Sequence, residues 1–325
     1  MTAVTRRTVC ALGLSAATAA LWAQGTGYPA RPVEWVVPYP AGGGTDVVAR
    51  TLAENLAKSL GQSFVINNKP GAGTNIAADY VARARPDGYT LLTADTATLA
   101  ANPSLYSRLT YNAERDFTPI GLIGRFHLLL VVNPSVPARN LRELLAWVKG
   151  NEGKLNYASP GAGSPHHLAM ELFAARIGAH FTHVPYRGAA PAVQDVIGAQ
   201  VPMMFVDLAA GYPHIVAGRL RVIGVASPQR LTSLPDVPTL AEGGLADFEA
   251  YAWQGLVAPA GTPAEVVDKL NGALRNALDS TAVKARFQVL GVEPTPGTPQ
   301  QMATYAKSER ARWGDLIKLI GIRLD

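Results

Sequence analysis

The stretch at 33–50, VEWVVPYPAGGGTDVVAR, constrains the fold most, because an apolar run passes through three consecutive glycines into a helical pattern. The run VEWVV is typical of a buried strand. Apolar residues then recur at a spacing of four, at Val48, Leu52, Leu56 and Leu60. This spacing predicts a helix at about 46–60, with Gly61 as its natural end. A strand that enters a helix through a short turn is the start of an α/β unit.

The next segments repeat this alternation. FVIN at 64–67 predicts a second strand, and PGAGTN at 70–75 leads into a helix that runs to about Ala84. PDGYTLL at 86–92 predicts a turn and a third strand. The order strand, helix, strand, helix, strand predicts parallel pairing, because parallel neighbours need a crossover between them.

A second round of the pattern follows in the middle of the chain. The strands expected there are 127–132, 155–159, 181–186, 201–206 and 220–227. Helices are expected at 141–149, after the loop 160–165, and at 189–198. The last third is helical, at 263–279, 281–290 and 299–320. The sequence therefore predicts two α/β units in succession and then a helical tail.

Two extended segments, near 117–127 and near 245–257, lie between the units and predict a double connection. We expect two lobes around a cleft, with the helical tail packed back on the first lobe. The predicted boundaries are 28–125 plus 248–325 for lobe 1 and 126–247 for lobe 2.

The first 23 residues differ from the rest of the chain. Arg6-Arg7 precedes TVCALGLSAATAALWA, which carries no charge. A basic start, a short apolar stretch and small residues near Ala23 predict a secretory signal peptide at 1–23, with a signal anchor as the alternative. Because the only cysteine, Cys10, lies in this segment, the mature chain has no disulfide and no thiolate metal site.

Composition and charge exclude two other classes. An apolar content of 48% with only 16% charged residues favours a globular protein over a disordered one. The formal net charge of +5 falls to +3 when the two arginines of the signal segment leave. The basic residues are scattered, so no nucleic-acid footprint is predicted. A weak positive field of this kind favours capture of small anions.

Three glycine-rich loops precede predicted helices: PAGGGTD at 40–46, PGAGTN at 70–75 and PGAGSP at 160–165. The first N–H groups of a helix have no partner within it, glycine lets a ligand approach them, and the helix dipole favours an anion. No Lys follows these glycines, and the dinucleotide pattern fails at Ile76, which argues against a nucleotide. A carboxylate is the favoured anion, although one loop alone is equally explained as a turn of the chain.

Polar side chains near these loops have both structural and functional interpretations. Asp46 is expected to cap its helix or complement the helix dipole, with a contact to a ligand amine as the alternative. Ser164 is expected to be an N-cap with Pro165 at the first helical position. A hydrolase using Ser164 and a histidine is the alternative, but no G-x-S-x-G elbow is present. His166 and His167 are adjacent on a helix and point in different directions, which argues against a metal site.

Four further residues have two interpretations each. Arg187, beside Gly188, is either a cation for a second carboxylate or a solvated surface residue. Asp207 ends an apolar strand, and it either meets a ligand or caps the segment that follows. Trp253 and Tyr39 are either apolar walls of a binding site or part of the core.

Long motifs in a fixed order resemble the Bug family, the extracytoplasmic solute-binding proteins of tripartite tricarboxylate transporters. They are YPARPVEWVVPYPAGGGTDVVAR, NKPGAGTNIAADYVARARPDGYTLL, NPSLY, LNYASPGAGSPHHLAMELF, HVPYRGAAPAVQDVIGAQV, LPDVPTLAEGG and WQGLVAPAGTP. The resemblance runs from Tyr28 to the C-terminal helices. It implies a type II periplasmic-binding-protein fold, with two α/β lobes, a ligand cleft between them and a two-strand hinge.

The resemblance also implies a function. It points to a periplasmic, non-enzymatic and monomeric receptor, without cofactor or metal, that passes a small carboxylate to membrane permease subunits. A di- or tricarboxylate, an acidic amino acid and an aromatic carboxylate all stay open as ligands. An accessory that presents its ligand to a signalling partner stays open as an alternative to transport.

In this family the two glycine-rich loops, one per lobe, hold a ligand carboxylate. The matching positions in the first loop are Tyr39, Ala41, Gly42, Gly43, Gly44 and Thr45. Those in the second are Ala162, Gly163, Ser164 and His167. Positions near the distal part of the ligand are Gly188, Ala189 and Asp207. The remaining candidate ligand contacts are Asp46, Thr96 and Arg187.

The chain departs from the family pattern in a few places. Thr74 and Ala77 stand where glycine is common. Pro165 and His166 fill the variable pair before His167, and Pro165 removes one N–H donor. These departures keep both loops and leave the identity of the ligand open.

Overall fold

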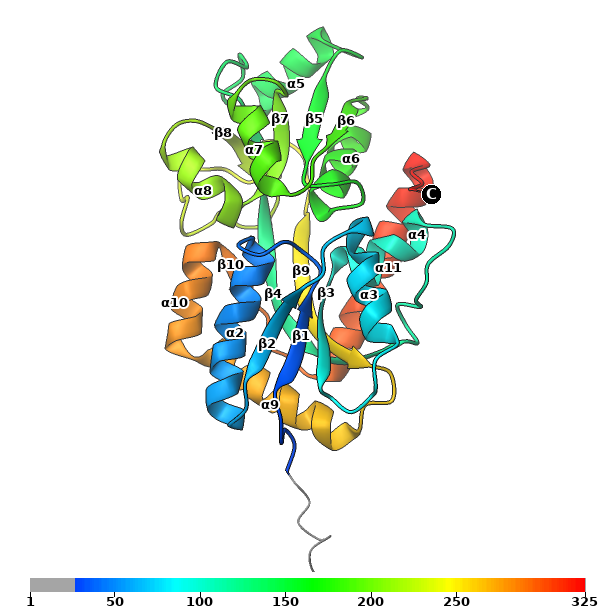
Figure 1. Cartoon of the computed structure of the whole chain (residues 1–325). Helices are drawn as coiled ribbons and strands as arrows, with labels where there is room; N and C mark the ends of the chain where they lie inside the picture. The colour runs from blue at the N-terminus through cyan, green and yellow to red at the C-terminus, as the bar shows by residue number, and fades with distance from the viewer. Residues whose placement is uncertain (1–26, 325) are drawn as a thin grey trace, which may run out of the picture.

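The computed structural model describes residues 27–324 and shows two α/β lobes arranged end to end (Figure 1). The predicted signal peptide and its cleavage position lie outside the described residues. Within residues 27–324, no helix has the length and apolar character needed to span a bilayer.

Lobe 1, the lower lobe in Figure 1, is built around a mixed sheet. Its strands are β1 (Val33–Val37), β2 (Phe64–Asn68), β3 (Thr90–Asp95), β9 (Tyr251–Pro259), β10 (Val292–Pro294) and the first part of β4 (Phe117–Val132). They follow the order β2-β1-β3-β9-β4, and β10 pairs with β4. β1 is parallel to β2 and β3, which confirms the predicted parallel pairing, whereas β9 is antiparallel to β3 and β4.

Helices cover both faces of this sheet (Figure 1). They are α2 (Gly44–Leu60), α3 (Asn75–Ala82), α4 (Asn102–Leu105), α9 (Ala264–Asp279), α10 (Thr281–Leu290) and α11 (Pro299–Ile320), with two short turns, η2 (Ala72–Thr74) and η3 (Ala97–Ala101). The stripe of Val48, Leu52 and Leu56 packs α2 against α9 and α10 on one face. On the other face α3, η3 and α11 surround Trp253 and Trp313. The helical tail therefore packs on lobe 1, as predicted.

Lobe 2 has a smaller sheet between two apolar clusters. Its strands are β5 (Asn156–Ser159), β6 (Thr182–Pro185), β7 (Met203–Asp207), β8 (Arg221–Val225) and the second part of β4. Its helices are α5 (Leu141–Gly150), α6 (Pro165–Ile177), α7 (Ala189–Ile197) and α8 (Leu208–Val216). The sequence did not predict α8, because its segment LAAGYPHIV contains Gly211 and Pro213, which disfavour a helix interior.

Two strands connect the lobes. β4 is one continuous strand that changes partner: His127 pairs with Tyr251 of β9, and the next residue, Leu128, pairs with Asp207 of β7. The chain returns just before β9, where the Ala250 N–H donates to a lobe 2 carbonyl at 3.0 Å. The two lobes and this two-strand connection confirm the predicted fold class.

The parallel strands place the predicted loops at the boundary between the lobes. The carboxyl ends of β1, β2 and β3 meet at one edge of lobe 1, and those of β5, β6 and β7 meet at one edge of lobe 2. These edges face each other: a Cβ atom built on Gly44 would lie 3.6 Å from Ala209 of α8. The glycine-rich loops after β1, β2 and β5 therefore lie where the lobes meet.

Candidate ligand-binding site

The first glycine-rich loop (40–46) is stabilised by hydrogen bonds to a buried carboxylate of lobe 1. Gly43 is the N-cap of α2, and no side chain within the described residues caps this helix. Asp46, expected to cap the helix or to complement its dipole, is not the cap; it lies in the first turn, where it complements the dipole, and is 2% exposed. One of its oxygens accepts from Gly42 N and Arg50 Nε, and the other accepts from Asn68 Nδ2, each at 2.9 Å. Both oxygens are thus engaged within lobe 1, and Asp46 positions the loop.

The charge of Asp46 suits this role. Burial works to raise its pKa, but hydrogen bonds from Arg50 and from neighbouring amide groups outweigh burial, and the pKa is lowered. The N–H groups of Gly43, Gly44 and Thr45 lie at the start of α2, where no carbonyl of the helix can accept from them. The loop therefore presents backbone donors and the positive end of a helix dipole to lobe 2.

Tyr39 leads into this loop and is anchored by Asp95 at the end of β3. The Tyr39 hydroxyl donates to one oxygen of Asp95, and Thr98 N and Oγ1 donate to the other at 2.9 and 2.8 Å. Burial raises the pKa of both Tyr39 and Asp95. Tyr39 is half-buried and packs against the core on the α2 side, and its role as a wall of a binding site stays a prediction.

Gln254 of β9 lies beneath the first loop. It is 4% exposed, and its Nε2 donates to Thr45 Oγ1 at 2.6 Å. Its Oε1 is buried and has no hydrogen-bond partner among the described residues. Because side chains alternate along a strand, Gln254 points to the α2 face while Trp253 points to α11.

The second glycine-rich loop (160–165) is stabilised largely within lobe 2. Ser164 is the N-cap of α6 and accepts from His167 N at 3.2 Å, and Pro165 occupies the first helical turn, which confirms the prediction. The Gly163 N–H donates to His167 Nδ1 at 3.0 Å, and the Ser164 N–H donates to a carbonyl of the loop at 3.2 Å. This loop thus offers fewer uncommitted donors than the start of α2.

A stack of rings supports the second loop. The rings of His167 and His183 lie 4.0 Å apart, and Tyr157 continues the stack at 4.9 Å from His183. Burial, with the neighbouring His183, lowers the pKa of His167 to about 3, and burial lowers that of His183 to about 4. Both rings are therefore neutral near pH 7, which agrees with His167 Nδ1 acting as an acceptor.

The contacts of the serines bear on the hydrolase alternative. Ser164 Oγ accepts from a backbone N–H and makes no contact with a histidine ring within residues 27–324. A serine–histidine pair does exist, because Ser159 Oγ lies 2.6 Å from His183 Nε2. However, Ser159 is 0% exposed, and its hydroxyl also bonds both backbone groups of Gly161. These serines hold the loop in shape.

His166 joins the two helices of lobe 2 that begin at the boundary. Its Nε2 lies 3.2 Å from Asp207 Oδ2, and Asp207 Oδ1 accepts from Ala210 N at 2.9 Å, so Asp207 caps α8. Burial raises the pKa of Asp207, but the contact with His166 and backbone donors outweigh it and lower the pKa. His166 and His167 contact different partners, as predicted. In the described part of the chain, no group of three or more His, Cys, Asp or Glu side chains is placed to hold a metal ion.

The start of α7 lies beside the second loop. Gly188 is its N-cap at φ 115°, and the Gly188 N–H donates to Pro160 O at 2.9 Å. Ala189 is the first helical residue. Arg187 is exposed and has no hydrogen bond or ion pair with any described residue, so its role as a cation for a ligand stays a prediction.

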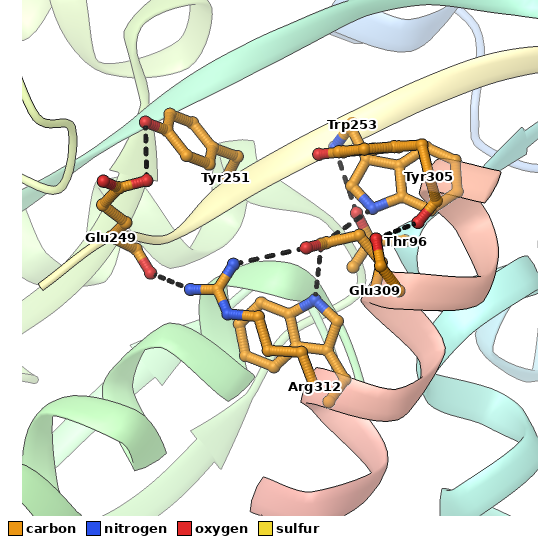
Figure 2. A network of polar contacts seen from close by, with 9 residues as sticks. Thr96, Glu249, Tyr251, Trp253, Tyr305, Glu309 and Arg312 are labelled. Atoms are coloured by element: carbon orange, nitrogen blue, oxygen red, sulfur yellow. Dashed lines mark hydrogen bonds and ion pairs between the residues drawn. The ribbon is translucent and has the colours of Figure 1, made fainter. Parts of the chain in front are cut away.

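Figure 2 shows a network that involves Thr96 and Trp253. Thr96 is 0% exposed, and its Oγ1 accepts from Trp253 N at 3.0 Å. Trp253 Nε1 donates to Glu309 of α11 at 3.1 Å, so of the two interpretations given for Trp253 the structure supports the core residue. Arg312 of α11 donates to the carbonyl of Glu249, just before β9. This network fixes β9 where it approaches lobe 2.

The structure brings the two predicted loops to the same boundary from opposite lobes. A Cβ atom on Gly163 would lie 2.9 Å from Leu105 and 3.0 Å from Leu324, both in lobe 1. Sequence reasoning gave no role at this boundary to three residues that contact the loops or the residues beside them, Asp95, His183 and Gln254, and it considered His166 only as a possible metal ligand and as a variable position. Their only local signals are a position at a strand end for Asp95 and a place within the quoted motifs for the others.

Comparison with known proteins gives consistent results. Residues 48–322 match the family model described as "Tripartite tricarboxylate transporter family receptor". Protein BugT of Bordetella pertussis is 38% identical over 321 residues, which cover 98% of each chain. The structure of Rpa4515 from R. palustris with adipate has a TM-score of 0.87 and 37% identity, covering 91% of this chain and 99% of that one. MatC from Rhodopseudomonas palustris, with bound malate, has a TM-score of 0.83 and 36% identity, covering 89% and 100%.

Proposed function

The chain belongs to the Bug family, the receptors of tripartite tricarboxylate transporters, and we propose that it captures a small organic carboxylate between the starts of α2 and α6. The observation that carries the proposal is the first turn of α2. There, Asp46 holds the loop from behind, and residues 43–45 present N–H groups to the other lobe. The adipate of Rpa4515 and the malate of MatC are both carboxylates, which supports this ligand class.

The charges at the boundary fit a small anion. Asp46 is paired with Arg50, and Asp207 with His166, so each carboxylate is engaged within its own lobe. The positive ends of α2, α6 and α8 all point to this boundary, and each favours an anion. The proposed ligand contacts on lobe 2 are Ala162 and Gly163 of the second loop, with Gly188 and Ala189 nearer the distal part of the ligand.

We place this function in the periplasm. The receptor acts as a monomer, its lobes close on the ligand, and the closed form is recognised by membrane permease subunits. Closure of this kind needs a ligand that contacts both lobes, because only differential contacts shift such an equilibrium.

A pair of substitutions at one position tests the role of α2. Gly43 has φ −75°, which proline also adopts, and a Cβ atom there meets only a carbonyl oxygen at 3.6 Å. Gly43→Pro therefore removes one N–H donor with little change in backbone shape, and Gly43→Ala is the matched control that keeps the donor. A hydrogen bond to a charged group is worth about 1.5–3 kcal/mol, so we expect Gly43→Pro to weaken binding by at least about tenfold.

Calorimetric titration of the purified mature protein with di- and tricarboxylates, acidic amino acids and aromatic carboxylates measures these affinities. We expect Gly43→Ala to keep most of the affinity for whichever acid binds. Equal affinities for the two variants would contradict the role of the α2 N–H groups. Absence of binding by every acid to the folded protein would contradict the carboxylate function itself.

A further inference from the structure

Gln254 carries a buried acceptor that the fold does not use. Its Nε2 donates to Thr45 Oγ1, in the first turn of α2, while its Oε1 has no donor among the described residues. A buried acceptor without a donor lowers the stability of the folded state. Such atoms are rare in natural proteins, and each one calls for an explanation. Because the two amide atoms share one carbon and Nε2 contacts the Thr45 side chain, Oε1 lies close to the first turn of α2.

Two other buried side-chain atoms at the boundary also lack a hydrogen-bond partner within residues 27–324. Asn102 uses its Nδ2 on the loop after β2, and its Oδ1 is unpartnered and lies 4.0 Å from the Cβ position of Gly163, in the opposite lobe. His166 Nε2 lies 3.2 Å from Asp207 Oδ2, and in the neutral ring whose Nε2 donates to Asp207 the other nitrogen, Nδ1, is an acceptor without a partner among the described residues. The polar side-chain atoms left unused near the two loops are therefore acceptors, and they are complementary to a donor.

The ligand group that donates to these acceptors is better matched by a neutral hydroxyl group than by a charged ammonium group. An ammonium group carries a full charge and needs a carboxylate nearby. The acidic side chains at the boundary are already engaged: Asp46 by Arg50, Asp95 by Tyr39 and Thr98, and Asp207 by His166. A hydroxyl group needs only one neutral acceptor, which the Gln254 amide oxygen provides.

We propose that Gln254 is a specificity-determining residue that accepts a hydrogen bond from a hydroxyl group on the carbon next to the bound carboxylate. The preferred ligands are then 2-hydroxy acids. This inference rests on the proposed function, since it takes the ligand carboxylate to lie at the start of α2. The Gln254 amide oxygen then binds the hydroxyl group of such an acid, and the N–H groups of α2 bind its neighbouring carboxylate.

Matched acids test this assignment on the mature protein. Three series each vary one substituent: malate, succinate and aspartate; lactate, propionate and alanine; mandelate, phenylacetate and phenylglycine. Calorimetric titration gives the ratio of affinities within each series that binds. We expect the hydroxy acid to bind about tenfold more tightly than the acid with hydrogen in its place, as a buried acceptor gains its donor.

Two substitutions then assign the preference to one side chain. Gln254→Met keeps the volume but removes the acceptor, and we expect the hydroxy-to-hydrogen ratio to fall below about twofold. Gln254→Glu keeps an oxygen acceptor that Thr45 can still reach, so we expect both affinities to fall while the ratio stays high. Gln288→Met, at an exposed position on α10, is the matched control and should change neither.

The outcomes separate the two proposals. Equal binding of hydroxy and unsubstituted acids by the unaltered protein would overturn the inference and leave the carboxylate function standing. Tighter binding of the amino acid, or a ratio that persists in Gln254→Met, would also overturn it. Failure of every acid to bind would overturn the proposed function and, with it, the inference. If Gln254→Met does not fold, the ratio in Gln254→Glu decides, because its collapse would contradict an acceptor role.

Discussion

Glu309 of α11 gives the sharpest stability prediction. Its side chain is 7% exposed, and one oxygen, Oε2, accepts from both Trp253 Nε1 at 3.1 Å and Trp313 Nε1 at 3.0 Å. The other oxygen lies 3.4 Å from Arg312 (Figure 2). The two tryptophans are 0% and 1% exposed, so water does not reach their N–H groups. One carboxylate oxygen thus serves two buried donors.

Glu309→Ala leaves both indole N–H groups without an acceptor. A buried donor that loses its acceptor costs about 1–3 kcal/mol, so with two such donors the free energy of unfolding should fall by about 2–6 kcal/mol. Glu309→Gln differs in one respect, because its amide oxygen can replace Oε2 and keep both indoles. Only the partly exposed ion pair with Arg312 is then lost, which is worth at most about 1 kcal/mol.

Urea unfolding followed by far-UV circular dichroism measures both changes, with the slope m used to check that the transition stays two-state. Glu54→Ala, at an exposed position on α2, is the control and should change the free energy of unfolding by no more than about 0.5 kcal/mol. A loss below about 1 kcal/mol for Glu309→Ala would refute the reasoning. So would a loss for Glu309→Gln equal to that for Glu309→Ala.

Three further predictions concern the second loop. Gly163→Ala should weaken ligand binding about tenfold, because at φ 76° its Cβ would press on two lobe 1 leucines, whereas Gly178→Ala, at φ 66° in open space, should lower only the free energy of unfolding. Calorimetry checks this, and equal effects on affinity would contradict it. Ser164→Ala removes the α6 cap and should lower the free energy of unfolding by about 1 kcal/mol in urea titrations, while Ser164→Asp should restore it. His167 and His183 have folded-state pKa values of about 3 and 4, below the ordinary 6.5, so acid protonates the unfolded chain first. The free energy of unfolding should therefore keep the full contribution of the two histidines above pH 6.5. It should fall as the pH drops towards 4, by up to about 1.4 kcal/mol per pH unit for each histidine. A free energy of unfolding that stays constant from about pH 6.5 to 5 would contradict this.

Several features of the fold and site follow from local patterns. The stripe of apolar residues predicted α2 because residues four apart share one face of a helix. Ser164 and Pro165 predicted the start of α6 because an N-cap acts on N–H groups two or three residues further on. A local pattern also gave Asp207 as a possible cap of the segment after its strand. The helix of that segment, α8, was not predicted because it contains Pro213.

Local patterns failed where a side chain had two possible partners. Asp46 was expected to cap α2 or to complement its dipole. It lies in the first turn, which suits the dipole, but Gly43 is the N-cap, and the carboxylate contacts Gly42 and Asn68. The Asn68 contact depends on β2 lying in register beside β1, which spacing along one strand does not reveal. Trp253 was a candidate wall of the site for a similar reason, since nothing near it in the chain indicates Glu309.

The chain's own pattern of strands, glycine turns and helix starts was enough to predict an α/β protein of two lobes with glycine-rich loops at their boundary, because these signals act over a few residues. The tertiary structure alone paired Gln254 with Thr45, 209 positions apart, and His166 with Asp207, 41 positions apart. Such pairs depend on which strands are neighbours and in what register. β4, for example, pairs with β9 up to His127 and with β7 from Leu128 onward. The backbone donors that we propose for a carboxylate are thus determined by local sequence, whereas the side-chain acceptors proposed to select the ligand come together only through the packing of distant strands.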